Sequence, residues 1–394
     1  MELVLTRASF LHGPFRPQIT NSRPMNDLGR LLRTAARVSR TRYPGFIFGL
    51  PLARGEIPIF TYHDVETQVF ARDLEFLHAN GYRTLSLEEY LAARNGGRRP
   101  ARAVLLTFDD ARKSFGTVAL PLLRTFDARA VLFAPAYWMT TPARPGDDLF
   151  MSWQEVRACI ESGLVDVQSH AHRHALVATS PQLVDFAHPD ALARFDIYDW
   201  PMRDLDGAEE LGRPAPGTPI YRSMPLLSAT RRYVENAELA HACREFVQRS
   251  GGDEFFKQPG WRQRLTGEHR RLSERMPGRF MDDQAFHALM ASEFELSREQ
   301  FRKHLACPPT SIAYPWMLGS PLSLELAKRY GLRTAFGVAL DYRAERRSAR
   351  LPIPVFGRLK CDWLQFLPGQ QRSSVLTAVG RKLSGIARLQ HLAH

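Results

Sequence analysis

Two adjacent carboxylates, Asp109 and Asp110, end the apolar run AVLLTF at residues 103–108. Neighbouring carboxylates repel each other when both are ionised, so the pair needs a counter-charge or a structural reason. One structural reason is a helix start, because aspartate caps the free backbone N–H groups of a first helical turn. The counter-charge could instead come from a bound cation. If Asp110 binds the cation, Asp109 can stay ionised beside it and act as a base toward water.

Three histidines form a second chemical pattern, HAHRH at residues 170–174, which follows the segment LVDVQS. His170 and His174 would lie on one face if the strand turned into a helix, and neutral imidazole is a common zinc ligand. Surface histidines also fall at this spacing by chance. However, FDD and HAHRH each follow an apolar strand, and strands of a parallel sheet end at one ligand-binding rim. One carboxylate and two histidines are a ligand set of catalytic zinc with an open position for water.

Apolar and amphipathic segments alternate from residue 56 onward, which predicts an α/β domain with a mainly parallel sheet or barrel. The sequence predicts strands at residues 57–62, 82–86, 103–108, 128–136, 164–169, 311–316, 332–339 and 351–356. It predicts helices at residues 69–81, 87–94, 115–127, 152–163 and 321–331.

The α/β pattern divides the chain into five parts. An N-terminal extension (1–55) carries a basic amphipathic helix over 26–39. Residues 56–180 form the first part of the barrel, and a mainly helical insertion with loops follows, with long helical patterns at 228–250 and 282–306. The expected ranges of the last three parts are 181–300 for the insertion, 301–367 for the second part of the barrel and 368–394 for a basic C-terminal helix.

Three segments in this order, TFDD, HAHRH and AYPW, resemble the signature segments of the polysaccharide deacetylases. This family is also called the NodB-homology domain or carbohydrate esterase family four. The phrases FTYHDV, LEFLHANGYRTLSLEEYL and ALPLLRTF resemble their surroundings, so the resemblance covers roughly residues 56–180 and 295–360. It implies a distorted (β/α) barrel that removes N-acetyl groups from amino sugars with a divalent metal.

The resemblance also implies roles for individual residues. By position, Asp109 matches the general base, and Asp110 matches a metal ligand completed by His170 and His174. His172 matches a variable position. Zinc is the default metal for this ligand set, and cobalt, nickel or iron(II) also suit it.

The resemblance implies that the third segment lines the substrate groove, with Tyr314, Pro315 and Trp316 as the binding residues. A backbone N–H near Pro315 or Trp316 would stabilise the tetrahedral oxyanion, and Trp316 would stack on a sugar face. A core strand that ends at a proline turn is the alternative interpretation.

The sequence departs from the family pattern at three positions. Ala313 stands where many members have an arginine that orients the base, so this orientation must come from elsewhere. Many members also have a histidine near the end of the domain that serves as general acid, and no convincing match to it follows Leu351. Ala111 stands where a glycine is common. His63 in FTYHDV is therefore the candidate general acid, although a histidine packed at a strand end is the alternative, and Asp64 would cap or orient it.

Composition restricts the partners and the location. The formal charge of +12 and the pI near 9.9 favour phosphate-bearing ligands or an anionic membrane surface, or simply reflect solvated arginines. The arginines are dispersed without a recognition motif, so nucleic acid is not an expected partner. The four separated cysteines suggest a reducing compartment. No secretion signal is recognisable, so we expect a cytoplasmic protein, with its basic terminal helices at the inner face of the membrane.

These patterns together predict a metal-dependent hydrolase of linear amide bonds in a bacterial carbohydrate pathway. The expected substrate is an N-acetylated amino sugar on a lipid or nucleotide carrier, used in cell-envelope glycan or lipopolysaccharide assembly. The alternatives are a deacetylase of a polymeric glycan, a deformylase of a lipid-linked sugar, and a catalytically inactive glycan- or membrane-binding scaffold.

Overall fold

The computed structural model describes residues 43–97, 99–140, 149–205, 208–337 and 351–373. Its contacts divide the chain into two compact units. The sheet unit contains the described residues of 24–172, 296–317 and 327–394, and the insertion unit contains those of 173–295 and 318–326. The helices expected at 26–39 and after residue 373 lie outside the described residues.

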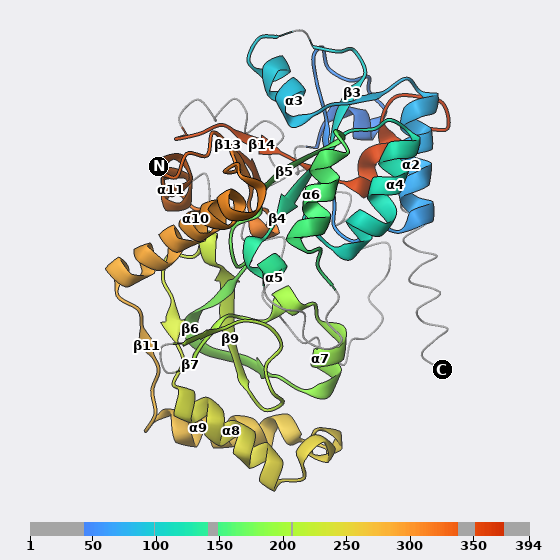
Figure 1. Cartoon of the computed structure of the whole chain (residues 1–394). Coiled ribbons are helices and arrows are strands. Elements are labelled where there is room, and N and C mark those ends of the chain that lie inside the picture. The colour runs from blue at the N-terminus through green and yellow to red at the C-terminus, as the bar shows by residue number, and fades with distance from the viewer. Residues whose placement is uncertain (1–42, 98, 141–148, 206–207, 338–350, 374–394) are drawn as a thin grey trace. The chain divides into compact units, whose positions relative to one another are not determined.

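The sheet unit is built on a nine-stranded parallel sheet (Figure 1). Its strands are β1 (Ile59–Tyr62), β2 (Arg83–Thr84), β3 (Ala103–Phe108), β4 (Ala130–Ala134), β5 (Val165–Ser169), β12 (Ser311–Ala313), β13 (Thr334–Gly337), β14 (Val355–Gly357) and β15 (Leu359–Lys360). Eight of them follow the order β14-β13-β12-β5-β4-β3-β1-β15, and β2 pairs with β3 outside this path.

The chain connection shows that this sheet curls into a barrel. β14 and β15 are the two ends of the strand order, yet only Arg358 separates them along the chain. A flat sheet of eight strands would hold its edges about 34 Å apart, because neighbouring strands lie about 4.8 Å apart. Two residue steps span no more than about 7 Å. The edges must therefore meet at Arg358, which confirms the expected α/β barrel-type fold.

Helices and short helical turns surround this sheet. They are η2 (Gly45–Phe48), α2 (Thr67–Ala79), α3 (Leu87–Arg94), η3 (Phe115–Ala119), α4 (Leu120–Thr125), α5 (Ala136–Thr140), α6 (Trp153–Glu161), η7 (Pro315–Met317) and η10 (Cys361–Phe366). The helix α11 (Pro321–Arg329) begins in the insertion unit and ends in the sheet unit. Figure 1 shows α2, α4 and α6 beside one another along the sheet. The sequence dictates the starts of α3 and α6, because Ser86 and Ser152 each form a capping box with a glutamate three residues later.

The apolar run AVLLTF forms the centre of the barrel core. β3 lies between β1 and β4, and all six of its residues are buried. Such a continuous apolar run is expected for a parallel strand that is covered on both faces. Phe108 at its end packs against Tyr62, Phe70 and Phe115. This aromatic cluster fixes the strand end from which Asp109 and Asp110 follow.

The insertion unit mixes strands and helices. It contains β6 (Leu176–Phe186), α7 (Pro189–Arg194), η4 (Ile197–Asp199), β7 (Arg203–Leu205), β8 (Ala208–Glu210), β9 (Pro219–Pro225), η5 (Leu226–Ser228), β10 (Tyr233–Val234), α8 (Ala237–Arg249), η6 (Gly252–Lys257), α9 (Trp261–Ser273), β11 (Arg279–Phe280) and the first half of α10 (Asp283–Leu305). β6 pairs with β9 antiparallel. Leu239, Val247, Phe255 and Leu265 centre the core between α8 and α9.

The described part of the insertion has more helical than strand residues, as expected, but the sequence did not predict its strands. Its first half, through residue 234, is built mostly on antiparallel strand pairs. The helix expected over residues 228–250 occupies only Ala237–Arg249, because Asn236 caps it through the amide of Leu239. The expectation over 282–306 is correct, since α10 covers it. Among the described residues, no helix combines the length and the apolar character needed to cross a bilayer.

One buried carboxylate of the barrel should make its stability depend on pH. Asp73 of α2 accepts hydrogen bonds from the Tyr62 hydroxyl (2.9 Å) and from the Gln365 side chain (3.0 Å). Burial raises the pKa of Asp73 to about 6, against the lowering effect of these two hydrogen bonds. A carboxyl whose pKa is higher in the folded state stabilises the fold below its unfolded pKa, and this contribution is lost as the pH rises through about 6.

We therefore predict that wild type loses about 2–3 kcal/mol of stability relative to Asp73→Asn between pH 3 and pH 7. The asparagine has no charge to bury and keeps hydrogen-bonding groups toward both neighbours. Urea unfolding of both proteins at several pH values measures this difference, and other titrating groups cancel in the comparison. A pH-independent difference would contradict the raised pKa.

Candidate metal and catalytic site

Asp109 and Asp110 occupy a sharp turn after β3. The amide of Asp109 donates to the Tyr62 carbonyl at 2.9 Å, which still continues the sheet. Asp110 and Ala111 then take φ values of +72° and +48°, the left-handed region that side chains rarely adopt. The next helical residue is Lys113, so Asp110 does not stand directly before a helix. Backbone strain of this kind is typical of functional sites.

The histidine segment follows β5 as an irregular loop. His170 and His174 therefore do not lie on one face of a helix, contrary to the expectation from the sequence. The amide of His170 still donates to the Ala134 carbonyl of β4 at 2.9 Å. Ala171 and His174 have φ values of +64° and +50°, so two left-handed residues redirect the chain. His170, His172 and His174 are all buried.

Asp110, His170 and His174 fit a metal ion by donor type and spacing. Each offers one ligand atom, and these atoms all lie within 4.8 Å of one another. The His170 Nε2 and Asp110 Oδ1 atoms are 3.4 Å apart, close to the edge of about 3.4 Å in a tetrahedron with zinc–ligand bonds near 2.05 Å.

A hydrogen bond sets the tautomer of His170 for this role. Its Nδ1 atom lies 2.7 Å from the Ala313 carbonyl oxygen, which can only accept. Nδ1 therefore carries the proton and Nε2 faces Asp110, the arrangement that metal-binding histidines commonly show. The residue at position 313 thus contributes through its backbone, so its alanine side chain does not weaken this contact.

Asp109 is held by a buried arginine. Arg358 donates from Nη1 to Asp109 Oδ1 and from Nη2 to Oδ2, both at 2.7 Å, and neither side chain is accessible beyond a few per cent. Burial alone would raise the pKa of Asp109, but the charge of Arg358 and then that of His170 hold this pKa below its ordinary value. The carboxylate is therefore ionised and fixed in orientation.

Arg358 supplies the orientation that the sequence could not assign. It is the single residue between β14 and β15, and its Nη1 atom also donates to the hydroxyls of Thr61 and Thr107. Its guanidinium lies over the Phe133 ring. A lone arginine within the apolar stretch IPVFGRL was the signal in the sequence, because an unpaired charge in such a strand region would be costly.

His63 lies at the rim of the same site. It follows β1, and its Nε2 atom is 3.9 Å from Asp109 Oδ2. Its side chain is 51% exposed, so it can exchange protons with solvent, and it is not the packed histidine of the alternative interpretation. The neighbouring Asp64 accepts a hydrogen bond of 3.5 Å from the Ser114 hydroxyl.

The third segment forms a strained turn after β12. Tyr314 and Pro315 are buried, and Trp316 is partly exposed. Trp316 and Met317 both take left-handed φ values, +50° and +60°. The Tyr314 and Met317 amides donate to the backbone carbonyls of Phe336 and Tyr314, and proline has no N–H.

Comparisons with known proteins agree with this geometry. Residues 96–187 match the family model described as polysaccharide deacetylase, a range that includes both aspartates and the histidine loop. The poly-β-1,6-N-acetyl-D-glucosamine N-deacetylase of Escherichia coli K12 is 36% identical over 119 residues, which are 28% of this chain and 18% of that protein. The enzyme of the same name from Staphylococcus epidermidis is 28% identical over 115 residues, 29% of this chain and 39% of that protein.

Solved structures with similar folds have low sequence identity. The BpsB deacetylase domain of Bordetella bronchiseptica has a TM-score of 0.49 at 19% identity, covering 77% of this chain and 95% of its own. A de-N-acetylase from Aggregatibacter actinomycetemcomitans has a TM-score of 0.49 at 16% identity, covering 82% and 98%.

The chain spans less than one fifth of the E. coli relative and about two fifths of the S. epidermidis relative. The part that matches the family model contains the strands and loops that carry Asp109, Asp110, His170 and His174. Over this part, the chain is thus similar to the polysaccharide deacetylase family of hydrolases, the NodB-homology family.

Proposed function

We propose that this protein is a metal-dependent deacetylase that removes the N-acetyl group from an amino sugar within a glycan. The observation that carries the proposal is the juxtaposition of an arginine-bound carboxylate, Asp109, with a ligand set of one carboxylate and two histidines. The names of the curated relatives support the amino sugar N-acetylglucosamine.

Asp110, His170 and His174 would hold the divalent metal, and zinc suits these donors best. When bound, such an ion polarises the amide carbonyl and lowers the pKa of a neighbouring water. The protein contributes the fixed ligand directions, because the Ala313 carbonyl holds His170 and the left-handed turns orient Asp110 and His174.

Asp109 would act as the general base. Its Oδ2 atom lies 3.9 Å from the Nε2 atoms of both His170 and His63, too far for direct hydrogen bonds. A water beside either pair could lie within hydrogen-bonding distance of both atoms, where the carboxylate could accept its proton. Arg358 prevents Asp109 from rotating away, since both its oxygens are bound.

His63 would act as the general acid toward the departing amine. It faces Asp109 from the exposed side of the site, so it can take up a proton from solvent and donate it to the leaving nitrogen. The Trp316 amide and ring remain proposed contacts for the oxyanion and for a sugar face.

Two forms of the substrate are proposed. The names of the relatives favour a polymer of β-1,6-linked N-acetylglucosamine. The basic composition instead favours a lipid- or nucleotide-linked precursor of envelope glycan synthesis, with cytoplasmic location and peripheral membrane association. The first form gives the leading proposal, because it rests on sequence similarity to two enzymes named for that substrate, whereas the second rests on composition.

The function is tested by measuring metal content and acetate release for the wild type, Asp109→Asn and Asp110→Asn. We expect about one equivalent of zinc in wild type and in Asp109→Asn, but loss of metal in Asp110→Asn, which lacks a ligand charge. Acetate release should fall at least about 10³-fold in both variants, since the base or the metal is missing. Substrates are β-1,6-linked N-acetylglucosamine oligomers, a nucleotide-linked and a lipid-linked N-acetyl sugar, and N-formyl analogues.

Acetate release from the oligomers alone would select the polymeric substrate, and release from the carrier-linked sugars alone would select the precursor. Faster formate release would make the protein a deformylase. A wild-type protein that binds zinc but leaves every substrate intact would support the non-catalytic scaffold.

Replacing Arg358 should shift the pH dependence of the reaction. In Arg358→Met the Asp109 carboxyl stays buried without its main counter-charge, so its pKa rises. The acid limb of kcat/KM, measured at saturating zinc, should move to higher pH by about one unit or more. Arg358→Lys keeps the charge but not the two parallel hydrogen bonds, so its shift should be smaller. An unmoved acid limb in folded Arg358→Met would exclude Asp109 as the titrating base.

The role of His63 can be separated from general damage by the choice of leaving group. His63→Gln should slow hydrolysis of the amide strongly, because an amine leaves only when protonated. It should slow hydrolysis of a p-nitrophenyl acetate ester little, because p-nitrophenolate leaves without a proton. Asp109→Asn serves as the matched control and should slow both. Equal losses on both substrates in His63→Gln would contradict the acid role.

A further inference from the structure

Arg173, the residue just before the ligand candidate His174, is held by a buried carboxylate of the insertion unit. Glu293 on α10 accepts from the backbone amide of Arg173 at 2.8 Å through Oε2. It also accepts from the Arg173 side chain at 2.7 Å through Oε1. Glu293 is 1% exposed, so solvent does not screen this pair strongly. One carboxylate thus fixes both the main chain and the side chain next to His174.

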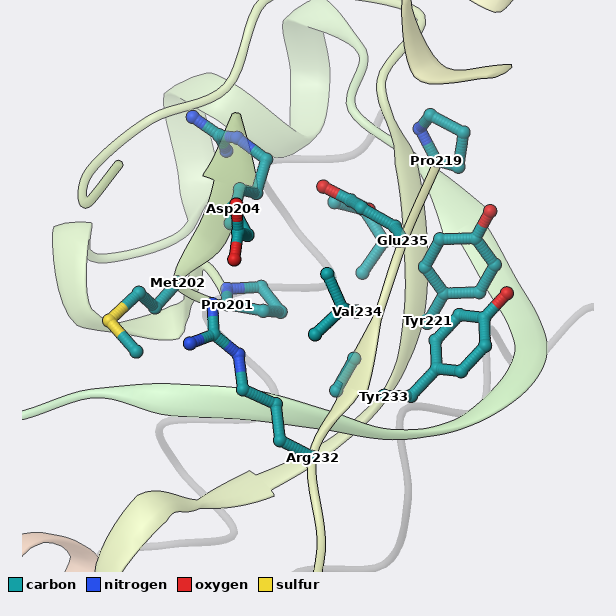
Figure 2. Close-up of a pocket in the computed structure, with 12 residues that line it drawn as sticks. Pro201, Met202, Asp204, Pro219, Tyr221, Arg232, Tyr233, Val234 and Glu235 are labelled. Atoms are coloured by element: carbon teal, nitrogen blue, oxygen red, sulfur yellow. The ribbon is translucent and has the colours of Figure 1, made fainter. Parts of the chain in front are cut away.

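A second carboxylate of the insertion unit, Glu209, adds to this clamp of Glu293 on Arg173. Glu209 in β8 lies 3.0 Å from Arg173 Nε through Oε2 and 3.5 Å from Arg232 Nη1 through Oε1. Arg232 is almost fully buried, and Figure 2 shows it at a small cavity with Asp204 and Glu235. The cavity measures about 20 Å³, which is room for about one water molecule. Arg173 is therefore held by Glu293 of α10 and by Glu209 of the paired strands β7 and β8, and Glu209 is itself held by the buried Arg232.

The residue that follows the clamp needs such support. His174 has a φ of +50°, a conformation that costs a non-glycine residue about 1–2 kcal/mol. Its ring stacks on Tyr198 of η4, with centroids 3.9 Å apart and planes inclined by 26°. Both side chains are buried. The backbone on one side and the ring on the other thus leave His174 little freedom to turn.

We propose that Glu293, with Glu209, is a positioning residue for the metal site: it holds Arg173 so that the strained His174 presents its imidazole as a ligand. This inference rests on the proposed metal-dependent function. It assigns the insertion a role in metal affinity, in addition to any role in substrate choice. Mutation of a residue that orients a metal ligand typically weakens metal binding roughly 10- to 100-fold.

The test measures Zn²⁺ affinity by competition with a chromophoric chelator, and the visible spectrum of the Co²⁺-loaded protein. Wild type, Glu293→Gln and the double variant Arg173→Met/Glu293→Met are compared. Glu254→Gln is the matched control, because it removes an exposed ion pair with Lys257 in the same unit. We expect Zn²⁺ binding to weaken about tenfold or more in Glu293→Gln and in the double variant, and to change less than about twofold in the control.

The Co²⁺ spectrum of Glu293→Gln should change in intensity, and deacetylation should recover at high Zn²⁺, since a misplaced ligand lowers metal occupancy more than kcat. If wild type binds no Zn²⁺, the proposed function fails and this inference with it. If wild type binds Zn²⁺ and a folded Glu293→Gln binds it equally with the same Co²⁺ spectrum, only the positioning role is overturned. If Glu293→Gln does not fold because Arg173 is left unpaired, the double variant, which buries no charge there, decides between the same two results.

Discussion

The ion pair between Arg358 and Asp109 joins the closure of the barrel to its chemistry. Arg358 is the only residue between the two end strands of the sheet, and its guanidinium is fully buried. Burying this charge alone would cost roughly several kcal/mol, so the seam, the point at Arg358 where the two end strands β14 and β15 meet, needs a carboxylate partner. Asp109 is that partner, and the bidentate geometry defines its orientation at the same time. A rearrangement of the seam would therefore change the proposed base directly.

The parallel arrangement explains why the remaining groups meet. β3, β5 and β12 run in one direction, so the aspartates after β3, the histidine loop after β5 and the Tyr314 turn after β12 follow their strands at one rim. The strands alone do not aim the side chains. Left-handed residues at Asp110, His174 and Trp316 turn the chain away from the sheet at each of these points, and this strain is supported by hydrogen bonds and packing nearby.

Local sequence predicted the strands, most helices and the residues of the histidine loop, because buried parallel strands and capped helices leave periodic signals. AVLLTF and the Ser152 cap are examples. The interaction of Arg358 with Asp109 could not be predicted in this way, since it joins residues 249 positions apart and depends on how the sheet closes. Left-handed histidine and tryptophan residues likewise lack a local signal, unlike glycine at such positions. Apart from β6 and β9, the strands of the insertion are only two or three residues long, so their pattern resembled that of loops.

Ala313 stands where the family resemblance implies an arginine that orients the base. Its side chain is indeed unable to hold Asp109, but its carbonyl oxygen fixes His170, and Arg358 from another strand end holds Asp109. The electrostatic requirement is a buried positive charge beside the base, and it does not prescribe the segment that supplies the charge. An arginine-bound carboxylate at this position therefore does not need an arginine at position 313, because the closed sheet brings Arg358 to Asp109 from another strand end.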